Sequence, residues 1–335
     1  MPENQPFDAL ILVSFGGPDG PDDVMPFLEN VLRGRRVPRE RMLEVAEHYQ
    51  HFGGASPINA QNKELIAAIK DDFSKNGIDL PIYWGNRNWH PMIDEALTQM
   101  NQDGVKKALA FFTSMFSCYS GCRQYRENIA DAQNEFEDAP EVHKVRMAYN
   151  HPLFIEACAD RVKDALGRVE PDRRAAARVT FTAHSIPISM SETSHYARQL
   201  QESARLVMES IGDQPWDLVY QSRSGPPMQP WLEPDICDHI QAIHDDGFRD
   251  DLIIMPLGFV SDHMEVMFDL DTEAQELCDE LSITMVRAGS VGVHPLFIQM
   301  IRELVLERTE GLEKRAIGQY PPNWDVCPKD CCKSR

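Results

Sequence analysis

Residues 253–271 read IIMPLGFVSDHMEVMFDLD, an apolar run that leads directly into charged residues. The apolar run predicts a buried strand, and Gly258 indicates the turn that ends it. His263 and Glu265 follow the turn, with Asp262 beside them. Acid and imidazole groups at the end of a strand suit proton or metal chemistry on a flat apolar substrate. The alternative is an ordinary helix start, where the helix dipole favours carboxylates.

Similar apolar runs alternate with amphipathic segments along the whole chain, which predicts parallel sheets covered by helices on both faces. Each half of the chain offers four strand candidates: residues 9–15, 82–86, 107–116 and 145–150, then 178–185, 217–223, 252–261 and 283–289. The sequence HPLF opens a predicted helix at His151 and again at His294. We therefore expect two similar α/β domains, residues 1–150 and 151–311, and an extension over 312–335.

Composition excludes several classes of partner. The chain has 335 residues and a net charge of −20, from 33 Lys and Arg against 53 Asp and Glu. Nucleic acids and anionic membranes both require a basic surface, so neither is expected as a partner. We also expect no transmembrane segment, because no apolar run is long enough to span a bilayer. The opening MPENQPFD does not resemble a signal peptide, which predicts a cytoplasmic protein with reduced cysteines.

The turn after the first predicted strand, Gly16–Pro18, is where a dinucleotide-binding protein would carry its glycines. Neither G-x-G-x-x-G nor G-x-x-x-x-G-K-[ST] occurs in the chain, so we expect no nucleotide cofactor. These glycines instead let the backbone approach a ligand or form a tight turn.

His184 and Glu265 follow two strands of the second half. In open parallel sheets, ligands bind beyond the carboxyl ends of the strands, so these two side chains can face each other. Together they offer nitrogen and oxygen ligands for a divalent metal and a base that works near neutral pH. A lone histidine is more often structural, and Glu265 favours the functional interpretation. His263 diverges from Glu265 on a regular helix. Either this segment is extended, or His263 and Asp262 only support the site.

The acids after this pair have a helical spacing. Glu265, Asp269, Glu273 and Glu276 follow steps of four, four and three residues, so on a helix they share one face. Such a row could conduct protons or iron. The commoner explanation is a solvated helix face.

Basic and hydroxyl side chains in the first half suit an anionic ligand. Arg33, Arg35 and Arg36 form an arginine cluster in an otherwise acidic chain. Ser56 lies in a Gly- and Pro-containing loop, and Tyr125 adds a phenol. Such donors can hold carboxylates at the rim of an apolar slot. For the arginines, the alternative is a helix end compensated by cations.

Five motifs in this order, SFGGP, GGASPIN, TAHSIP, QSRSGP and GFVSDHMEVMFDLD, closely resemble the ferrochelatase family. The resemblance runs from the first strand to about Gly311. It is greatest to the bacterial branch that inserts ferrous iron into coproporphyrin III and gives coproheme. It implies two flavodoxin-like (Rossmann-like) domains, each a four-stranded parallel sheet flanked by helices, with the porphyrin in the cleft between them. Iron is then a substrate of this lyase.

The resemblance also implies roles for individual residues. His184 and Glu265 correspond to the iron-contacting pair, with His184 as acceptor of the pyrrole protons. Ser56 and Tyr125 match positions assigned to porphyrin contacts, and the arginine cluster matches a rim that binds propionates. Phe15 departs from relatives that carry a tyrosine able to reach the metal. A phenyl ring cannot ligate iron, so Phe15 can only pack on the macrocycle.

The sequence VCPKDCCKSR at residues 326–335 holds three cysteines: Cys327, Cys331 and Cys332. Some ferrochelatases carry a [2Fe–2S] cluster on three such cysteines and one internal cysteine. A cluster of this kind needs four thiolates. Cys158 resembles the internal ligand, with Cys118 and Cys122 as competitors. We therefore expect a structural cluster on Cys158 and the three tail thiols, although the C-x₃-C-C spacing is tighter than in the relatives. The alternative is a frayed, reducible tail.

Three other functions are compatible with parts of this pattern. One is a protoporphyrin IX ferrochelatase, and another is a chelatase that inserts cobalt or nickel into a reduced tetrapyrrole. The third is a haem-binding or haem-delivery protein without turnover, but a carrier needs no proton acceptor such as His184. The resemblance also allows a partner enzyme of the haem pathway, which the sequence does not identify.

Overall fold

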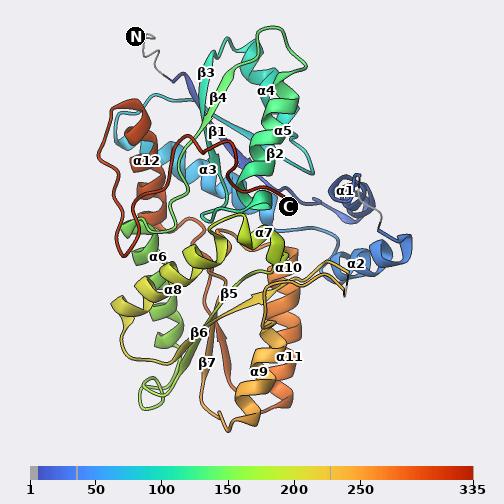
Figure 1. The fold of residues 1–335 in the computed structure, drawn as a ribbon, viewed down its shortest axis with the longest axis vertical. Coiled ribbons are helices and arrows are strands. Elements are labelled where there is room, and N and C mark those ends of the chain that lie inside the picture. Colours follow the sequence, from blue (N-terminus) through green and yellow to red (C-terminus); the bar gives the residue numbers. More distant parts are fainter. Residues whose placement is uncertain (1–6, 35–36, 227, 335) are drawn as a thin grey trace. The chain divides into compact units, whose positions relative to one another are not determined.

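The computed structural model describes residues 7–34, 37–226 and 228–334, which form two four-stranded sheets (Figure 1). All strand pairs within each sheet are parallel. The sheets belong to two units of the chain. Unit 1 comprises Met1–Thr113, Gln124–Val145 and Ile301–Glu313, and unit 2 comprises Ser114–Arg123, Arg146–Met300 and Lys314–Arg335. The predicted fold of two flavodoxin-like parallel sheets is confirmed, whereas the ligand cleft stays a prediction.

The sheet of unit 1 has the strand order β2-β1-β3-β4. Its strands are β1 (Ala9–Ser14), β2 (Ile82–Asn86), β3 (Lys107–Phe112) and β4 (Glu141–Lys144). Strand β1 is completely buried because it lies inside a parallel sheet. The helices of this unit are α1 (Val24–Val31), α2 (Arg39–His51), α3 (Ile58–Lys75), α4 (Ile93–Gln102) and α5 (Gln124–Gln133), preceded by the short η1 (Pro21–Asp23).

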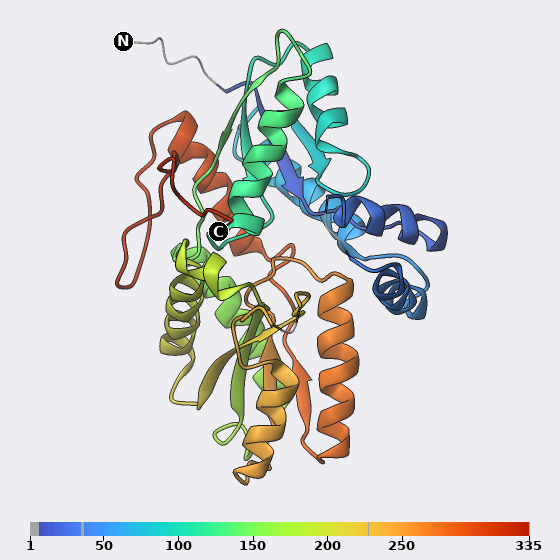
Figure 2. The same cartoon turned by 45° about the vertical axis from the view of Figure 1, so that its right-hand side comes forward.

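The sheet of unit 2 repeats this arrangement with the order β6-β5-β7-β8. Its strands are β5 (Arg178–His184), β6 (Trp216–Gln221), β7 (Leu252–Met255) and β8 (Met285–Arg287). Its helices are α6 (Pro152–Gly167), α7 (Ile188–Glu192), α8 (Tyr196–Ile211), α9 (Ile236–Asp245), α10 (Met264–Val266), α11 (Gln275–Glu280) and the π-helices η2 (Tyr119–Arg123) and η3 (Met267–Ala274). Figures 1 and 2 show α6 and α8 on one side of this sheet and α9 and α11 on the other.

The repeated HPLF sequence caps two helices in the same way. The Nδ1 atom of His151 accepts a hydrogen bond from the Leu153 N–H at 3.3 Å at the start of α6. The Nδ1 atom of His294 accepts the corresponding bond from Leu296, also at 3.3 Å, at the start of α12 (Pro295–Thr309). In both helices proline occupies the first position, where its missing N–H costs nothing. Helix α12 begins in unit 2 and ends in unit 1.

One local prediction was wrong. The strand expected at residues 145–150 is instead β4, at 141–144, because this edge strand is too polar to show an apolar run. The acidic helix expected after β7 is present, but most of it is the π-helix η3, which a spacing of four residues does not distinguish from an α-helix. Among the helices that the structure describes, none is both long and apolar enough to cross a membrane.

Candidate active site

His184 is the last residue of β5, and two hydrogen bonds hold its ring and its backbone in place. The Nδ1 atom lies 2.5 Å from the Ser185 carbonyl oxygen, and the Tyr196 hydroxyl donates to the His184 carbonyl at 3.0 Å. A carbonyl oxygen can only accept, so Nδ1 must carry the proton. When the ring is neutral, the Nε2 atom therefore keeps a lone pair that can accept a proton or bind a metal.

Glu265 lies opposite this lone pair. Its Oε2 atom is 3.5 Å from the His184 Nε2 atom, and the two side chains are 49% and 32% exposed, so a ligand can reach both. Glu265 lies in α10, which begins after the extended residue His263. The structure thus brings together the two side chains that the sequence singled out. An imidazole and a carboxylate at this distance can share a proton or approach one divalent ion.

His263 and Asp262 lie beside this pair. Burial lowers the pKa of His263, and its ring meets the edge of Phe259 with the centroids 4.8 Å apart. Asp262 accepts two hydrogen bonds from the Arg287 guanidinium, at 3.1 and 3.0 Å. Arg287 also forms an ion pair with Asp271 at 2.5 Å. Arg287 therefore binds the residues on both sides of Glu265 in the sequence, Asp262 and Asp271.

Asp269 lies on η3, and its carboxyl group is held by β6. The Gln221 side chain donates to Oδ2 at 3.2 Å, and the Ser222 hydroxyl donates to the same oxygen. Ser222 has a positive φ of 60°, which is unusual for a residue other than glycine. Burial raises the pKa of Asp269 to about 7, assisted by the negative charges of Glu265 and Glu273. This carboxyl can therefore change its protonation state near neutral pH.

The row of acids continues to α9. Burial raises the pKa of Glu273, and the nearby charges of Asp235 and Glu276 raise it further. Cys237 lies among the same groups: burial first, then Asp235, Glu273 and Asp269, raise its pKa to about 12. Asp235 and Cys237 carry no local sequence signal, because the packing of α9 against η3, not sequence spacing, brings them to the row.

Phe15 follows β1 directly and is 36% exposed. The guanidinium of Arg87 lies 5.8 Å from the centre of its ring, and Phe27 meets the ring edge-on at 6.2 Å. The predicted position of an apolar ring at the end of the first strand is therefore confirmed. The sequence did not indicate the cation above the ring.

A chain of hydrogen bonds connects Arg33 to Phe15. The Arg33 Nη2 atom donates to the Asn30 Oδ1 atom at 2.5 Å, and the Asn30 side chain donates to the Asn88 carbonyl at 3.2 Å. Asn88 in turn donates to the Phe15 carbonyl, from its side chain at 3.2 Å and from its N–H at 3.1 Å. Neutral amides thus position the residue at the end of β1.

Two of the other residues predicted to bind the ligand at its rim are buried, unlike Phe15. Ser56 and Tyr125 are both buried, and the Tyr125 ring stacks on Phe112 with the centroids 5.3 Å apart. Arg35 and Arg36 lie outside the described residues.

Asn59 and Asn86 were missed by sequence analysis. The buried Asn86 side chain donates to the Asn59 Oδ1 atom at 3.2 Å, and the Asn59 side chain donates to the Gly17 carbonyl at 2.8 Å. A Cβ atom on Gly17 would lie 2.6 Å from the Cβ of Ser56, so only glycine fits this turn. The repeated asparagines of WGNRNWHP were the available signal.

The cysteines assigned to a cluster lie in different surroundings within unit 2. Cys158 is buried in α6. In the tail, the sulfur atoms of Cys331 and Cys332 are 3.2 Å apart. Among the residues with described positions, no three His, Cys, Asp or Glu side chains are already arranged to hold a metal ion.

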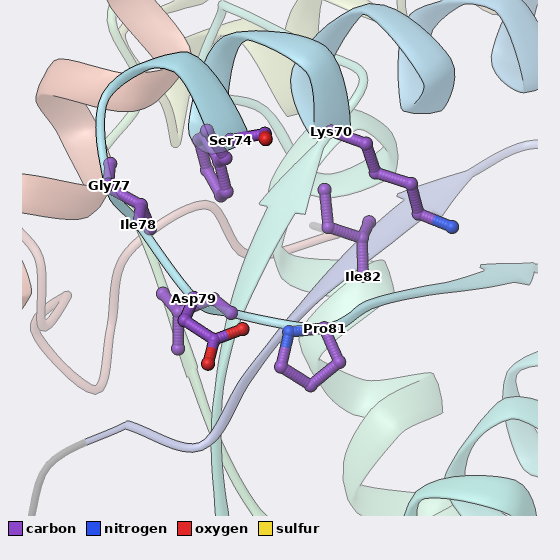
Figure 3. Close-up of a pocket in the computed structure, with 9 residues that line it drawn as sticks. Lys70, Ser74, Gly77, Ile78, Asp79, Pro81 and Ile82 are labelled. Carbon is purple, nitrogen blue, oxygen red and sulfur yellow. The ribbon is translucent and has the colours of Figure 1, made fainter.

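A surface hollow of about 520 Å³ in unit 1 contains none of the predicted site residues (Figure 3). It is lined by the end of α3 and the segment that leads into β2, with Lys70, Ser74 and Asp79 among its side chains. We assign it no role.

Comparisons with known proteins relate the whole chain to one family and one fold. The family model described as Ferrochelatase matches residues 7–309. A ferrochelatase from Rhodopirellula baltica is 61% identical over 334 residues, which cover 99% of this chain and 95% of that protein. A coproporphyrin III ferrochelatase from Streptomyces coelicolor is 46% identical over 354 residues, covering 98% and 94%. The structure of SirB from Bacillus subtilis with Fe³⁺ covers 91% of this chain and 98% of its own. Its TM-score is 0.56 at 14% identity, which shows a shared fold.

Proposed function

The chain belongs to the ferrochelatase family of metal-inserting lyases, and on this premise we propose that it inserts Fe²⁺ into coproporphyrin III to form coproheme. The substrate is supported by relatives of 45–48% identity that carry the name coproporphyrin III ferrochelatase. The single structural observation behind the metallation chemistry is the 3.5 Å approach of the His184 Nε2 atom to Glu265.

Metallation replaces two pyrrole protons of the porphyrin by one Fe²⁺ ion. We propose that the His184 Nε2 lone pair accepts a pyrrole proton, because the Ser185 carbonyl holds the ring proton on Nδ1. His184 passes this proton through Glu265 to Asp269, and its Nε2 atom then accepts the second pyrrole proton. The deprotonated Glu265 carboxylate contacts the incoming iron. Neutral imidazole and carboxylate are suitable ligands for a first-row divalent ion. The two side chains can therefore both remove pyrrole protons and contact the iron.

The acids behind the pair are proposed to carry protons away or to supply iron. Asp269 suits proton transfer, since its pKa of about 7 lets it accept and release a proton at neutral pH. Glu273 follows it in the row, and its pKa is also raised. His263 and Asp262 are proposed to support Glu265, His263 as a half-buried ring with a lowered pKa and Asp262 through Arg287.

Unit 1 is proposed to bind the porphyrin. The exposed ring of Phe15 offers an apolar surface to the macrocycle, and Arg33 offers a cation to its propionates. Arg87, above the Phe15 ring, is a second cation at this strand end. Ser56 and Tyr125 remain proposed contacts. Because a phenyl ring has no ligating atom, iron contacts are assigned to unit 2 alone.

The test is an anaerobic assay of the purified protein with Fe²⁺ and either coproporphyrin III or protoporphyrin IX, followed by the absorption change of the porphyrin. We expect metallation of coproporphyrin III at the higher kcat/KM. A preference for protoporphyrin IX would overturn the proposed substrate. Binding of either porphyrin or its haem without metallation would instead support a haem-binding or haem-delivery protein.

A cytoplasmic location and a partner enzyme in the haem pathway stay predictions. The strongly acidic composition supports the first, because it disfavours binding to anionic membranes. The second would be tested by co-purification from cells that make haem.

A further inference from the structure

Strand β5 loses its neighbour on one side before it reaches His184. It pairs with β6 as far as His184, opposite Gln221, but with β7 only as far as Phe181, opposite Met255. Strand β7 ends at Met255, and the next residue, Pro256, has no N–H to donate. The last three residues of β5 therefore have a strand on one side only. Their carbonyl groups on the open side need donors from elsewhere.

Two donors from outside the sheet complete this open side. Carbonyl groups two residues apart along a strand point to the same side. The Thr182 carbonyl accepts a hydrogen bond from the Gly258 N–H at 2.9 Å, in the turn that follows β7. The His184 carbonyl accepts one from the Tyr196 hydroxyl at 3.0 Å. The hydroxyl of Tyr196 thus replaces the N–H that a neighbouring strand would supply at the end of β5.

The Tyr196 hydroxyl acts on the peptide group that joins His184 to Ser185. The C=O of this group accepts from Tyr196, and its N–H donates to the Gln221 carbonyl of β6 at 2.8 Å. The peptide plane is therefore held at both ends. The next carbonyl, that of Ser185, accepts the proton of the His184 Nδ1 atom. Rotation of the plane would displace this acceptor, and with it the ring whose Nε2 atom lies 3.5 Å from Glu265.

Tyr196 has little freedom to move. It is the first residue of α8, and its side chain is buried, with a residue exposure of 5%. Its ring meets the ring of Phe116 edge-on, with the centroids 6.3 Å apart. Burial raises the pKa of the hydroxyl above its ordinary value, so the hydroxyl keeps its proton and stays a donor. A buried donor of this kind fixes the direction of the carbonyl that it meets.

Helix α8 is itself fixed within unit 2 by two further side chains. Gln199, three residues after Tyr196, accepts from the Ser117 N–H at 2.7 Å and donates to the Ser117 hydroxyl at 3.2 Å. The buried Glu202 accepts from the Gln319 N–H at 2.6 Å. The helix is thus tied to two separate segments of the unit, and it gives the Tyr196 hydroxyl a fixed base.

We infer that Tyr196 is a positioning residue for metallation, which holds the His184–Ser185 peptide so that the Nε2 lone pair of His184 faces Glu265. This inference rests on the proposed function, because it takes His184 as the acceptor of the pyrrole protons. Tyr196 acts through His184 and keeps its own proton throughout. Proton transfer requires close alignment of donor and acceptor, so a small displacement of the ring lowers the rate.

The test compares Tyr196→Phe, which removes only the hydroxyl and keeps the ring against Phe116, with Tyr149→Phe, a matched control at another buried tyrosine of unit 2. Both are assayed anaerobically with Fe²⁺ and coproporphyrin III, and thermal unfolding checks that both are folded. We expect Tyr196→Phe to lower kcat about tenfold with KM for the porphyrin nearly unchanged, and Tyr149→Phe to match wild type. An unchanged kcat, or a change in KM alone, would overturn the inference.

A second measurement does not depend on turnover. In protein labelled with ¹⁵N at histidine, the shifts of the ring nitrogens report which of them carries the proton, and His184→Ala identifies the signals. At a pH where the ring is neutral, wild type and Tyr149→Phe should carry the proton on Nδ1. Tyr196→Phe should place a measurable fraction on Nε2. Lower turnover without this shift would indicate a merely structural role and overturn the inference.

The two measurements also separate this inference from the proposed function. Wild-type protein that metallates neither porphyrin would refute the proposed function. The ring nitrogens would then still show whether Tyr196 positions His184: a shift of the proton in Tyr196→Phe would support it, and identical spectra would contradict it.

Discussion

Strands β1 and β5 occupy the same place in their sheets, second in the orders β2-β1-β3-β4 and β6-β5-β7-β8, yet they end in different chemistry. Phe15 follows β1, and its backbone carbonyl accepts hydrogen bonds from Asn88. His184 ends β5, and its ring lies opposite the carboxylate of Glu265. The scaffold thus provides two equivalent strand ends. The side chains placed there decide whether an end packs against a ligand or exchanges protons.

The side chains next to the two strand ends also differ in whether they can take up or release a proton. Behind Phe15 the connections are neutral amides, Asn30 and Asn88, which cannot titrate. Behind Glu265 they are carboxyl groups, Asp269 and Glu273, with raised pKa values. We therefore expect variants of unit 2 to alter turnover and its pH dependence, and variants of unit 1 to alter porphyrin affinity.

The largest expected effect comes from removing the side chain at each of the two strand ends. His184→Ala removes the proposed proton acceptor and should lower kcat by about 100-fold or more, as loss of a general base does. Phe15→Ala, at the residue that follows β1, should raise KM and leave kcat within a few-fold of wild type. Steady-state kinetics with Fe²⁺ and coproporphyrin III, together with porphyrin binding by fluorescence quenching, measure both. A larger loss of kcat in Phe15→Ala than in His184→Ala would break the comparison.

Next in size is the effect of Arg287 on stability. Arg287→Met leaves Asp262 and Asp271 without their shared cation, in surroundings where these side chains are 21% and 36% exposed. We expect the free energy of unfolding to fall by about 2 kcal/mol, less than for a fully buried pair because of that exposure. Urea unfolding measures it. The matched variant in unit 1, Arg302→Met, frees one carboxylate, Asp72, and should cost less.

Asp269 should make stability depend on pH. Its folded-state pKa of about 7 is above the ordinary value of 3.8, so between these values the folded protein binds a proton that the unfolded chain releases. The stabilisation is complete below about pH 4 and is lost as the pH rises through 7. From about pH 5 to about pH 8, we expect wild-type protein to lose on the order of 2 kcal/mol more than Asp269→Asn. Urea unfolding at both pH values measures this difference. Parallel pH curves for the two proteins would contradict the raised pKa.

The residues at the strand ends could be predicted from sequence. The side chains that contact them from other elements could not. His184 and Glu265 stand out because ionisable residues at or shortly after the end of an apolar run leave a local signal. Asp235 and Cys237 reach the acidic row through the packing of α9 against η3, and Asn88 reaches Phe15 across 73 residues of sequence. Such long-range pairing leaves no periodic pattern in a single chain.

The smallest effect, at Asn88, tests whether neutral amides do position Phe15. Asn88→Ala removes the side-chain hydrogen bond to the Phe15 carbonyl but keeps the backbone one at 3.1 Å, so the strand end should loosen without losing its place. A hydrogen bond of this kind contributes about 1 kcal/mol, and we expect KM for the porphyrin to rise about fivefold with kcat unchanged. Asn76→Ala, which removes an exposed asparagine side chain at the end of α3, is the control. If Asn88→Ala lowered kcat instead, the amide network of unit 1 would belong to the catalytic chemistry, and the division between the two strand ends would be wrong.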